Sequence, residues 1–239
     1  MAIVSLGVET LVFAHEVGSP SASSIDVLLI IPFLATIPLM AYVGGIVLIL
    51  CGVGLLIPRT MLVSAIALGS LLYLCALITQ VPRNFAEPGS VGLRTTLFEP
   101  LAIGSFAWLL LPVAALPLRF ERAIRGLLGV SLIVFGVDHF ILLEPIAGLI
   151  PNWIPGHVFW TAFFGVAFIA AGLGIGLKLL ERWAAACLGL MFAIWVITLH
   201  IPIALGLFKI RPAPIPNHWS SLFIAMAMWG GAWALASRE

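Results

Sequence analysis

Long apolar stretches dominate the chain, and short groups of proline, glycine and charged residues separate them. The apolar residues run continuously and do not alternate with polar ones, which is typical of a membrane helix and not of a barrel strand. A hydrocarbon core of about 30 Å requires about 20 residues of helix. The pattern therefore predicts about eight transmembrane helices, over residues 2–17, 34–57, 60–82, 96–117, 123–143, 157–178, 183–204 and 218–236.

The composition agrees with an integral membrane protein. Hydrophobic residues make up 62% of the chain and charged residues 9%, and the mean hydropathy is +1.21. The formal net charge is +1 without any basic run, so the expected partner is the lipid bilayer and not a nucleic acid. Cys51, Cys75 and Cys187 lie within apolar stretches and form no CxxC pair, so we expect them to be small buried residues.

The charged residues between the apolar stretches predict how the chain is oriented. Short basic turns at 57–60, 118–125 and 177–183 alternate with longer segments rich in proline, asparagine and histidine. If the basic turns share one side with the chain ends, seven Lys and Arg residues lie there and four lie on the other side. The positive-inside rule then predicts that both termini are cytoplasmic.

The two halves of the chain resemble each other. Three glycines and a proline recur at an offset of 120 residues, namely Gly45, Gly52, Gly54 and Pro82 as Gly165, Gly172, Gly174 and Pro202. Glycines seven residues apart share one helix face, so we expect them to let a neighbouring backbone approach closely. The predicted fold class is all-α, a polytopic membrane helix bundle of two parallel four-helix repeats, residues 1–118 and 119–239.

Ionisable side chains gather toward the outer end of the predicted helices. Asp138 and His139 stand side by side in the apolar run "IVFGVDHFILLEPI", and Glu144 follows just before Pro145. An ionisable residue within a span is costly, by about 2.5–3.5 kcal/mol for a central aspartate, and is a candidate for a functional site. The histidines all fall at this end: His15, His139, His157, His200 and His218.

One helical stripe carries His139. Gly129, Leu132, Gly136 and His139 follow the spacing of a single helix face. Because this face is rich in small residues, we expect it to pack against protein and to take His139 with it. Asp138 is rotated by about 100° and shares a face with Ser131.

Several segments of the second half resemble the DoxX family of bacterial and archaeal membrane proteins. They are "RGLLGVSLIVFGVDHF", "IPNWIP", "LGIGLKLLERW" and a helix that closes with "HIP". The first half is similar through "GVGLLIPRTMLVSAIAL" and "RTTLFEPLAIGSFAWLL", so the resemblance covers most of the chain as two units. The family's helix ending of glycine followed by His-Phe matches Gly136, His139 and Phe140.

The resemblance implies a location and a redox association. It implies a multi-pass protein of a bacterial or archaeal cytoplasmic (inner) membrane. Relatives include a subunit of thiosulfate:quinone oxidoreductases and membrane partners of oxidative-stress enzymes. Partners of this chain would then be quinone and other membrane or periplasmic redox subunits, and any enzyme would be quinone-linked.

The leading hypothesis is a redox-associated subunit with a quinone-type site near the outer leaflet. Histidine suits such a site because its pKa lies near neutral pH, and an apolar cleft would hold the ring. Asp138 and His139 are the catalytic candidates, and Trp153 or Trp160 the cleft walls. The candidates for binding the cofactor are His139, Glu144, His157, His200 and His218.

Three other hypotheses compete with the quinone site. Imidazoles also suit haem or copper, although no two of these histidines share a helix at the spacing of metal ligands. A small-solute transporter would use Glu9, Arg83 and Asp138 along its path, and parallel repeats occur in carriers. In a structural or assembly subunit of a membrane complex, the histidines would only form hydrogen bonds at the interface.

Overall fold

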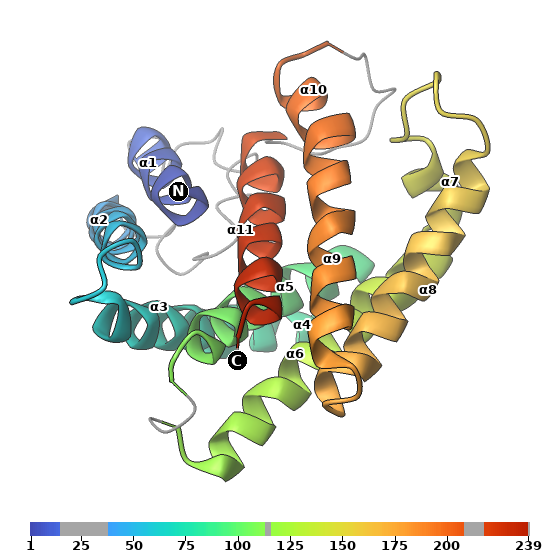
Figure 1. Ribbon diagram of the computed structural model, residues 1–239. Helices are drawn as coiled ribbons and strands as arrows, with labels where there is room; N and C mark the ends of the chain where they lie inside the picture. The colour runs from blue at the N-terminus through green and yellow to red at the C-terminus, as the bar shows by residue number, and fades with distance from the viewer. Residues whose placement is uncertain (15–37, 113–115, 208–217, 239) are drawn as a thin grey trace. The chain divides into compact units, whose positions relative to one another are not determined.

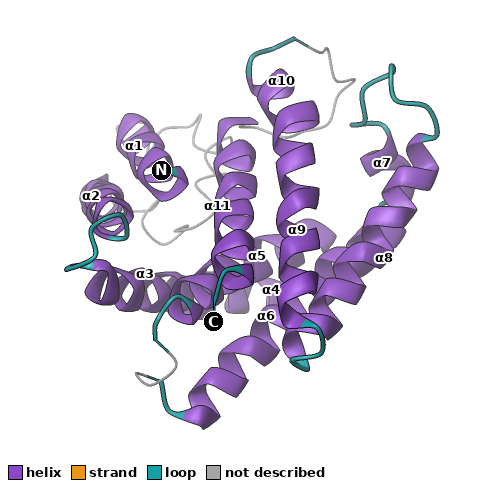
Figure 2. Ribbon diagram, viewed as in Figure 1, coloured by secondary structure: helices purple, strands orange, loops and turns teal. Residues whose placement is uncertain are grey.

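A computed structural model of the protein describes residues 1–14, 38–112, 116–207 and 218–238. Within these ranges the chain is all-helical and forms no strand (Figure 2). It divides into two compact units, Met1–Ala115 and Leu116–Glu239, close to the boundary predicted between residues 118 and 119. His15, Lys209, Arg211 and the outer ends of the first two predicted spans lie outside the described residues.

Each unit consists of helices (Figure 1). Unit 1 contains α1 (Ala2–Phe13), α2 (Pro38–Gly54), α3 (Met61–Cys75), the π-helical turn Ala76–Gln80, α4 (Val81–Ala86) and α5 (Val91–Leu109). Unit 2 contains α6 (Leu118–Ile141), α7 (Leu143–Ala147), α8 (His157–Gly176), α9 (Glu181–Trp195), the π-helical turn Val196–His200, α10 (Ile201–Ala204) and α11 (His218–Ala236).

The lengths of these helices indicate a multi-pass membrane protein. Five helical stretches of the described residues are long and apolar enough to cross a bilayer: Met61–Ala86, Leu118–Ile141, His157–Gly176, Glu181–Ala204 and His218–Ala236. Ala2–Phe13 and Ala41–Gly54 are apolar but shorter, and α5 is not among the five. Every predicted span overlaps a helix, and the crossing number of eight stays a prediction.

Glycines bring α6 and α8 into backbone contact in unit 2. A Cβ added to Gly136 would lie 2.6 Å from the carbonyl oxygen of Gly165, and one added to Gly172 would lie 2.6 Å from that of Gly129. Real Cβ atoms essentially never come so close, so these positions require glycine. Close approach of this kind maximises packing between helices that gain little from leaving lipid. The prediction for these glycines is confirmed.

The same type of contact joins α1 and α2 in unit 1. A Cβ on Gly7 would lie 2.7 Å from the carbonyl oxygen of Gly45 and 2.7 Å from Cγ1 of Ile49. In unit 2 the corresponding contact of Gly136 with Cγ1 of Ile169 is 2.6 Å. Each unit therefore begins with a helix pair that meets through glycine.

A tryptophan covers a glycine in each unit. A Cβ on Gly69 of α3 would lie 2.3 Å from Nε1 of Trp108 on α5. A Cβ on Gly189 of α9 would lie 2.5 Å from Cδ1 of Trp233 on α11. In each unit a tryptophan side chain of the last helix, α5 or α11, thus packs on a glycine backbone of α3 or α9.

Each unit also has a π-helical turn just before a proline. The turn Ala76–Gln80 precedes Pro82, and the turn Val196–His200 precedes Pro202. Proline has no N–H to continue the helical hydrogen bonds, and its ring clashes with the carbonyl four residues earlier. A wider turn relieves this clash. Such turns are rare and frequently occur at functional sites.

A buried ion-pair cluster joins the start of α6 to the start of α9. Nη2 of Arg125 lies 2.6 Å from Oε1 of Glu121, and Nη1 pairs with Glu181. Arg125 is 4% exposed and Glu121 3%. Loss of one partner would leave a buried charge without compensation, so the cluster holds the two helices together.

We expect Gly136→Ala to weaken the packing of α6 on α8, because the new methyl group meets the Gly165 backbone. Overpacking typically costs about 1–3 kcal/mol, which should lower the melting temperature in detergent. Gly126→Ala on the same helix is the matched control, since nothing lies within 4 Å of its added Cβ. Equal melting temperatures for the two variants would contradict the contact.

We expect Arg125→Ala to destabilise the protein by about 3–5 kcal/mol, because it removes the cation that pairs with the buried Glu121 and with the partly buried Glu181. Thermal unfolding followed by tryptophan fluorescence measures the loss. Arg122, three residues earlier, is exposed, so Arg122→Ala should change stability little. A melting temperature of Arg125→Ala equal to that of Arg122→Ala would exclude the proposed role of the cluster.

Candidate functional site around His139

His139 lies near the end of α6 with its ring against α8. The ring centroids of His139 and Phe168 are 5.2 Å apart, and the planes are tilted by 47°. Gly129 and Gly136, on the same stripe, contact the backbone of α8, and Leu132 is fully buried. The prediction that this stripe faces protein is therefore confirmed.

A hydrogen bond fixes the His139 ring. Nδ1 lies 2.7 Å from the carbonyl oxygen of Phe135, one turn earlier on α6. A carbonyl oxygen only accepts, so Nδ1 carries the proton of this bond. Nε2 is left to act on a ligand, as an acceptor when the ring is neutral and as a donor when it is protonated.

The phenylalanine that contacts His139 belongs to a group of packed aromatic rings. Phe168 lies 6.0 Å from Phe135 and 5.6 Å from Phe192 of α9, centroid to centroid, both edge-on. Phe135 and Phe168 are buried. The imidazole is thus the polar member of an otherwise aromatic cluster formed by Phe135, His139, Phe168 and Phe192, which we call the His139 cluster.

The two predicted acids differ in their surroundings. Asp138 is 5% exposed and shares a buried face with Ser131, as its spacing of seven residues from Ser131 predicts. Glu144 lies in the first turn of α7 and is exposed. Of the two carboxylates, only Asp138 is enclosed, so it is the stronger candidate for a role beside His139.

The remaining histidines lie farther along the helices. Phe168 follows His157 by eleven residues on α8, which is on the order of 15 Å at the rise of a helix. His200 follows Phe192 by eight residues, which is on the order of 10 Å. The His139 ring contacts Phe168, so both histidines lie toward the helix ends from the phenylalanines of the cluster.

His200 and His218 lie at a similar level on neighbouring helices. Val196 of the π-helical turn packs with Leu222 and Ala225 of α11. His200 is one turn beyond Val196, and His218 is one turn before Leu222, so both lie in the same direction from this contact. His157, His200 and His218 are each partly buried.

The structure gives no metal site from these residues. Among the described residues, no group of three His, Cys, Asp or Glu side chains is arranged to hold a metal ion. A copper site with three or more such ligands therefore has no support among the described residues. His139 is accompanied by aromatic rings and not by other imidazoles.

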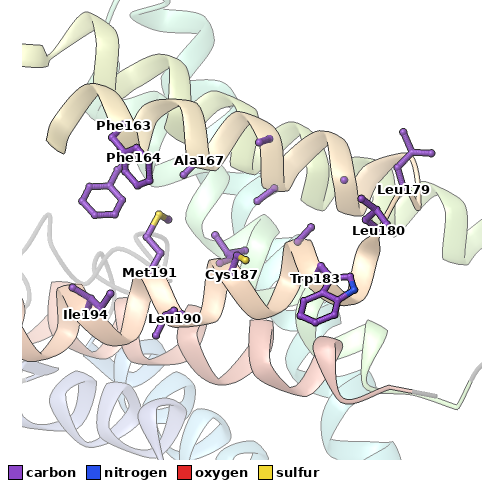
Figure 3. A pocket seen from close by; sticks show the side chains of 15 residues that line it. Phe163, Phe164, Ala167, Leu179, Leu180, Trp183, Cys187, Leu190, Met191 and Ile194 are labelled. Carbon is purple, nitrogen blue, oxygen red and sulfur yellow. The ribbon is translucent and has the colours of Figure 1, made fainter. Parts of the chain in front are cut away.

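An apolar groove of about 630 Å³ lies between α8 and α9. Figure 3 shows Phe164 of α8 and Cys187 and Met191 of α9 between the two helices. None of the predicted site residues lines it, and the only side-chain N–H group in its wall belongs to Trp183. The groove therefore offers surface for an acyl or isoprenoid chain and little to hold a polar ring.

One detail of the sequence interpretation needs correction. Cys51 and Cys75 are buried, but Cys187 is exposed because it faces this groove. Trp153 is 65% exposed and Trp160 stacks on Phe164 at 5.9 Å, and their role as walls of a quinone cleft stays a prediction. The sequence analysis did not identify Phe168 and Phe192 as members of the site. The one signal in the sequence is the i, i+4 spacing of Phe135 and His139, which places these two side chains on one helix face.

Comparisons with protein-family models, with curated proteins and with solved structures find no match to this chain.

Proposed function

We propose that the protein is a redox-associated subunit of a membrane complex, with a quinone-type site near the outer leaflet centred on His139. The observation that carries this proposal is the single imidazole of the His139 cluster, whose Nδ1 is already bound and whose Nε2 is left for a ligand. Aromatic rings stack well on a quinoid ring, and quinone sites need few polar groups.

The fixed Nδ1 decides how His139 meets each form of the ligand. A neutral His139 accepts a hydrogen bond at Nε2 from a quinol hydroxyl. Donation from Nε2 to a quinone carbonyl requires the doubly protonated ring. Asp138, the preceding residue on α6, is the buried acid next to His139 in the sequence. Asp138 and His139 would together hold the proton that the ligand exchanges.

The location near the outer leaflet rests on the charges at the ends of α6. Arg119, Arg122 and Arg125 lie near its start, and His139 lies two residues before its end. If the arginine end faces the cytoplasm by the positive-inside rule, His139 lies close to the opposite membrane surface. A periplasmic or membrane redox partner would then reach the site from that side.

We also propose that the chain consists of two DoxX-like four-helix units in tandem. Support comes from contacts that recur inside each unit: the glycine pairing of its first two helices, the π-helical turn before proline, and the tryptophan over glycine. These contacts match Gly7 to Gly136, so Glu9 corresponds to Asp138 and Thr10 to His139. The buried acid is common to both units, whereas the imidazole is particular to unit 2.

Two alternatives remain as outcomes of the tests. A small-solute transporter would use the buried acids Glu9 and Asp138 together with Arg83, and a structural or assembly subunit would need no ligand at all. Solute uptake that depends on Glu9 and Asp138 but not on His139 would favour the transporter. A complex that assembles and works normally without the imidazole would favour the structural role.

We expect His139→Ala to weaken the binding of a short-tailed ubiquinone or menaquinone analogue by about tenfold or more, because one hydrogen bond to the ring is lost. Titration of the purified full-length protein in detergent, followed by quenching of tryptophan fluorescence, measures the dissociation constant. His157→Ala is the matched control, since His157 lies far along α8 from the cluster. We expect that variant to bind like the wild type.

The melting temperature separates loss of the ligand contact from loss of the fold. His139→Ala should unfold within a few degrees of the wild type, because the ring is only partly buried. A folded His139→Ala variant with unchanged affinity for both analogues would reject the quinone site. Asp138→Asn should still bind the analogue, because His139 provides the hydrogen bond to the ring, but its proton exchange with the ligand should slow.

We expect eight crossings with both termini in the cytoplasm. Single cysteines at Ser90 and Ala123, in a variant without the three native cysteines, test this with a membrane-impermeant maleimide on intact cells. Ser90 should react from outside, and Ala123, which is exposed near the start of α6, should react only after the cells are opened. Labelling of Ala123 from outside would reverse the predicted orientation and place His139 at the cytoplasmic surface.

A further inference from the structure

Unit 1 holds a carboxyl group that the proposed quinone site does not use. Oε2 of Glu99 is buried and has no hydrogen-bond partner, and it is the single side-chain atom of this kind among the described residues. Glu99 lies eight residues after the start of α5, which is roughly 12 Å along the helix. The carboxyl group therefore lies about two turns beyond the start of α5.

Glu99 lies on the side of α5 that meets the π-helical turn of unit 1. Thr96 precedes it by three residues, so the two side chains share a helix face. Oγ1 of Thr96 lies 3.2 Å from Oε1 of Gln80 and 2.9 Å from the carbonyl oxygen of Leu93. Gln80 ends the π-helical turn and is fully buried. The same face of α5 thus carries Glu99 and the Thr96 hydroxyl that is bonded to the buried amide of Gln80.

An ionised carboxylate is unfavourable at the buried position of Glu99 Oε2. It only accepts hydrogen bonds, and a buried charge without a partner is costly. A proton removes the charge and turns one oxygen into a donor, which can bond to a helix carbonyl as the hydroxyls of Thr79 and Ser105 do. The charged or titratable groups on the elements packed against Glu99 are Tyr73, Cys75, Arg83 and, on α5 itself, Arg94.

The corresponding position of unit 2 indicates that packing does not require the carboxyl group. Trp108 and Trp233 occupy the same place over a glycine in their units. Nine residues before each stand Glu99 and Ile224, and Ile224 is 6% exposed. An aliphatic side chain fills this position in unit 2, so the acid in unit 1 has a role of its own.

We propose that Glu99 is a proton-binding site of unit 1, held as a neutral carboxylic acid beside Gln80 and Thr96 and able to take up and release a proton. This role goes beyond the quinone site and does not depend on it. The ligand is the proton, since a neutral acid and an uncharged amide leave no net charge to attract a metal cation.

A hydrophobic carbodiimide tests this directly. The carboxyl oxygen bonds to the central carbon of dicyclohexylcarbodiimide while the acid proton moves to one of its nitrogens, and the adduct rearranges to a stable acylurea. Full-length protein in membrane vesicles is treated near neutral pH, digested and mapped by mass spectrometry. We expect the adduct on Glu99, with labelling that falls about tenfold for each pH unit once the acid ionises.

Several controls make the outcome decisive. Glu99→Gln should lose the adduct, while Glu9→Gln should keep it. A water-soluble carbodiimide should modify the exposed Glu87 and leave Glu99 unmodified. An unlabelled Glu99, or a Glu99 that reacts only with the water-soluble reagent, would overturn the proposal. Protection of Glu99 by Na⁺ or K⁺ at constant pH would overturn it in favour of a metal cation. The wild-type map stands even if Glu99→Gln does not fold.

Discussion

Helices in a bilayer gain little by burying apolar surface against one another, so close van der Waals contact has to hold them together. Here that contact is made by glycine, with carbonyl oxygens of one helix resting on bare Cα atoms of the next. The position of the candidate site depends on it. Gly136 meets Gly165 on α8, and His139, three residues further, reaches Phe168, three residues beyond Gly165. A wider separation of α6 and α8 would remove the imidazole from its aromatic neighbours.

The same low-polarity surroundings decide how buried polar groups are satisfied. Thr10, Ser105 and Thr198 each donate to the carbonyl four residues earlier on their own helix, and His139 does the same through Nδ1. These bonds need no partner from another helix. A carboxylate has no proton to donate and cannot use this solution, which is why Glu99 differs from the other polar residues of α5.

Much of the helical framework is predictable from the sequence, because span length and glycine spacing report directly on membrane thickness and on backbone contact. The stripe of Gly129, Gly136 and His139 is a clear case. The surroundings of the histidines are not predictable in this way, since the ring that contacts His139 belongs to Phe168 on another helix. The exposure of Cys187 also depends on a groove between two helices, and nothing local to the sequence marks it.

The π-helical turns bear on how the two units evolved. Such a turn holds one residue more than an α-helical turn of the same rise, and that residue rotates everything after it by about 100°. Deleting it would turn the proline and the polar residue at the end of the turn away from their neighbours. Both units have the turn at the same distance before their proline. If the two units descend from one ancestral gene, the inserted residue was already present before that gene was copied, and later divergence changed Gln80 and His200 without removing it.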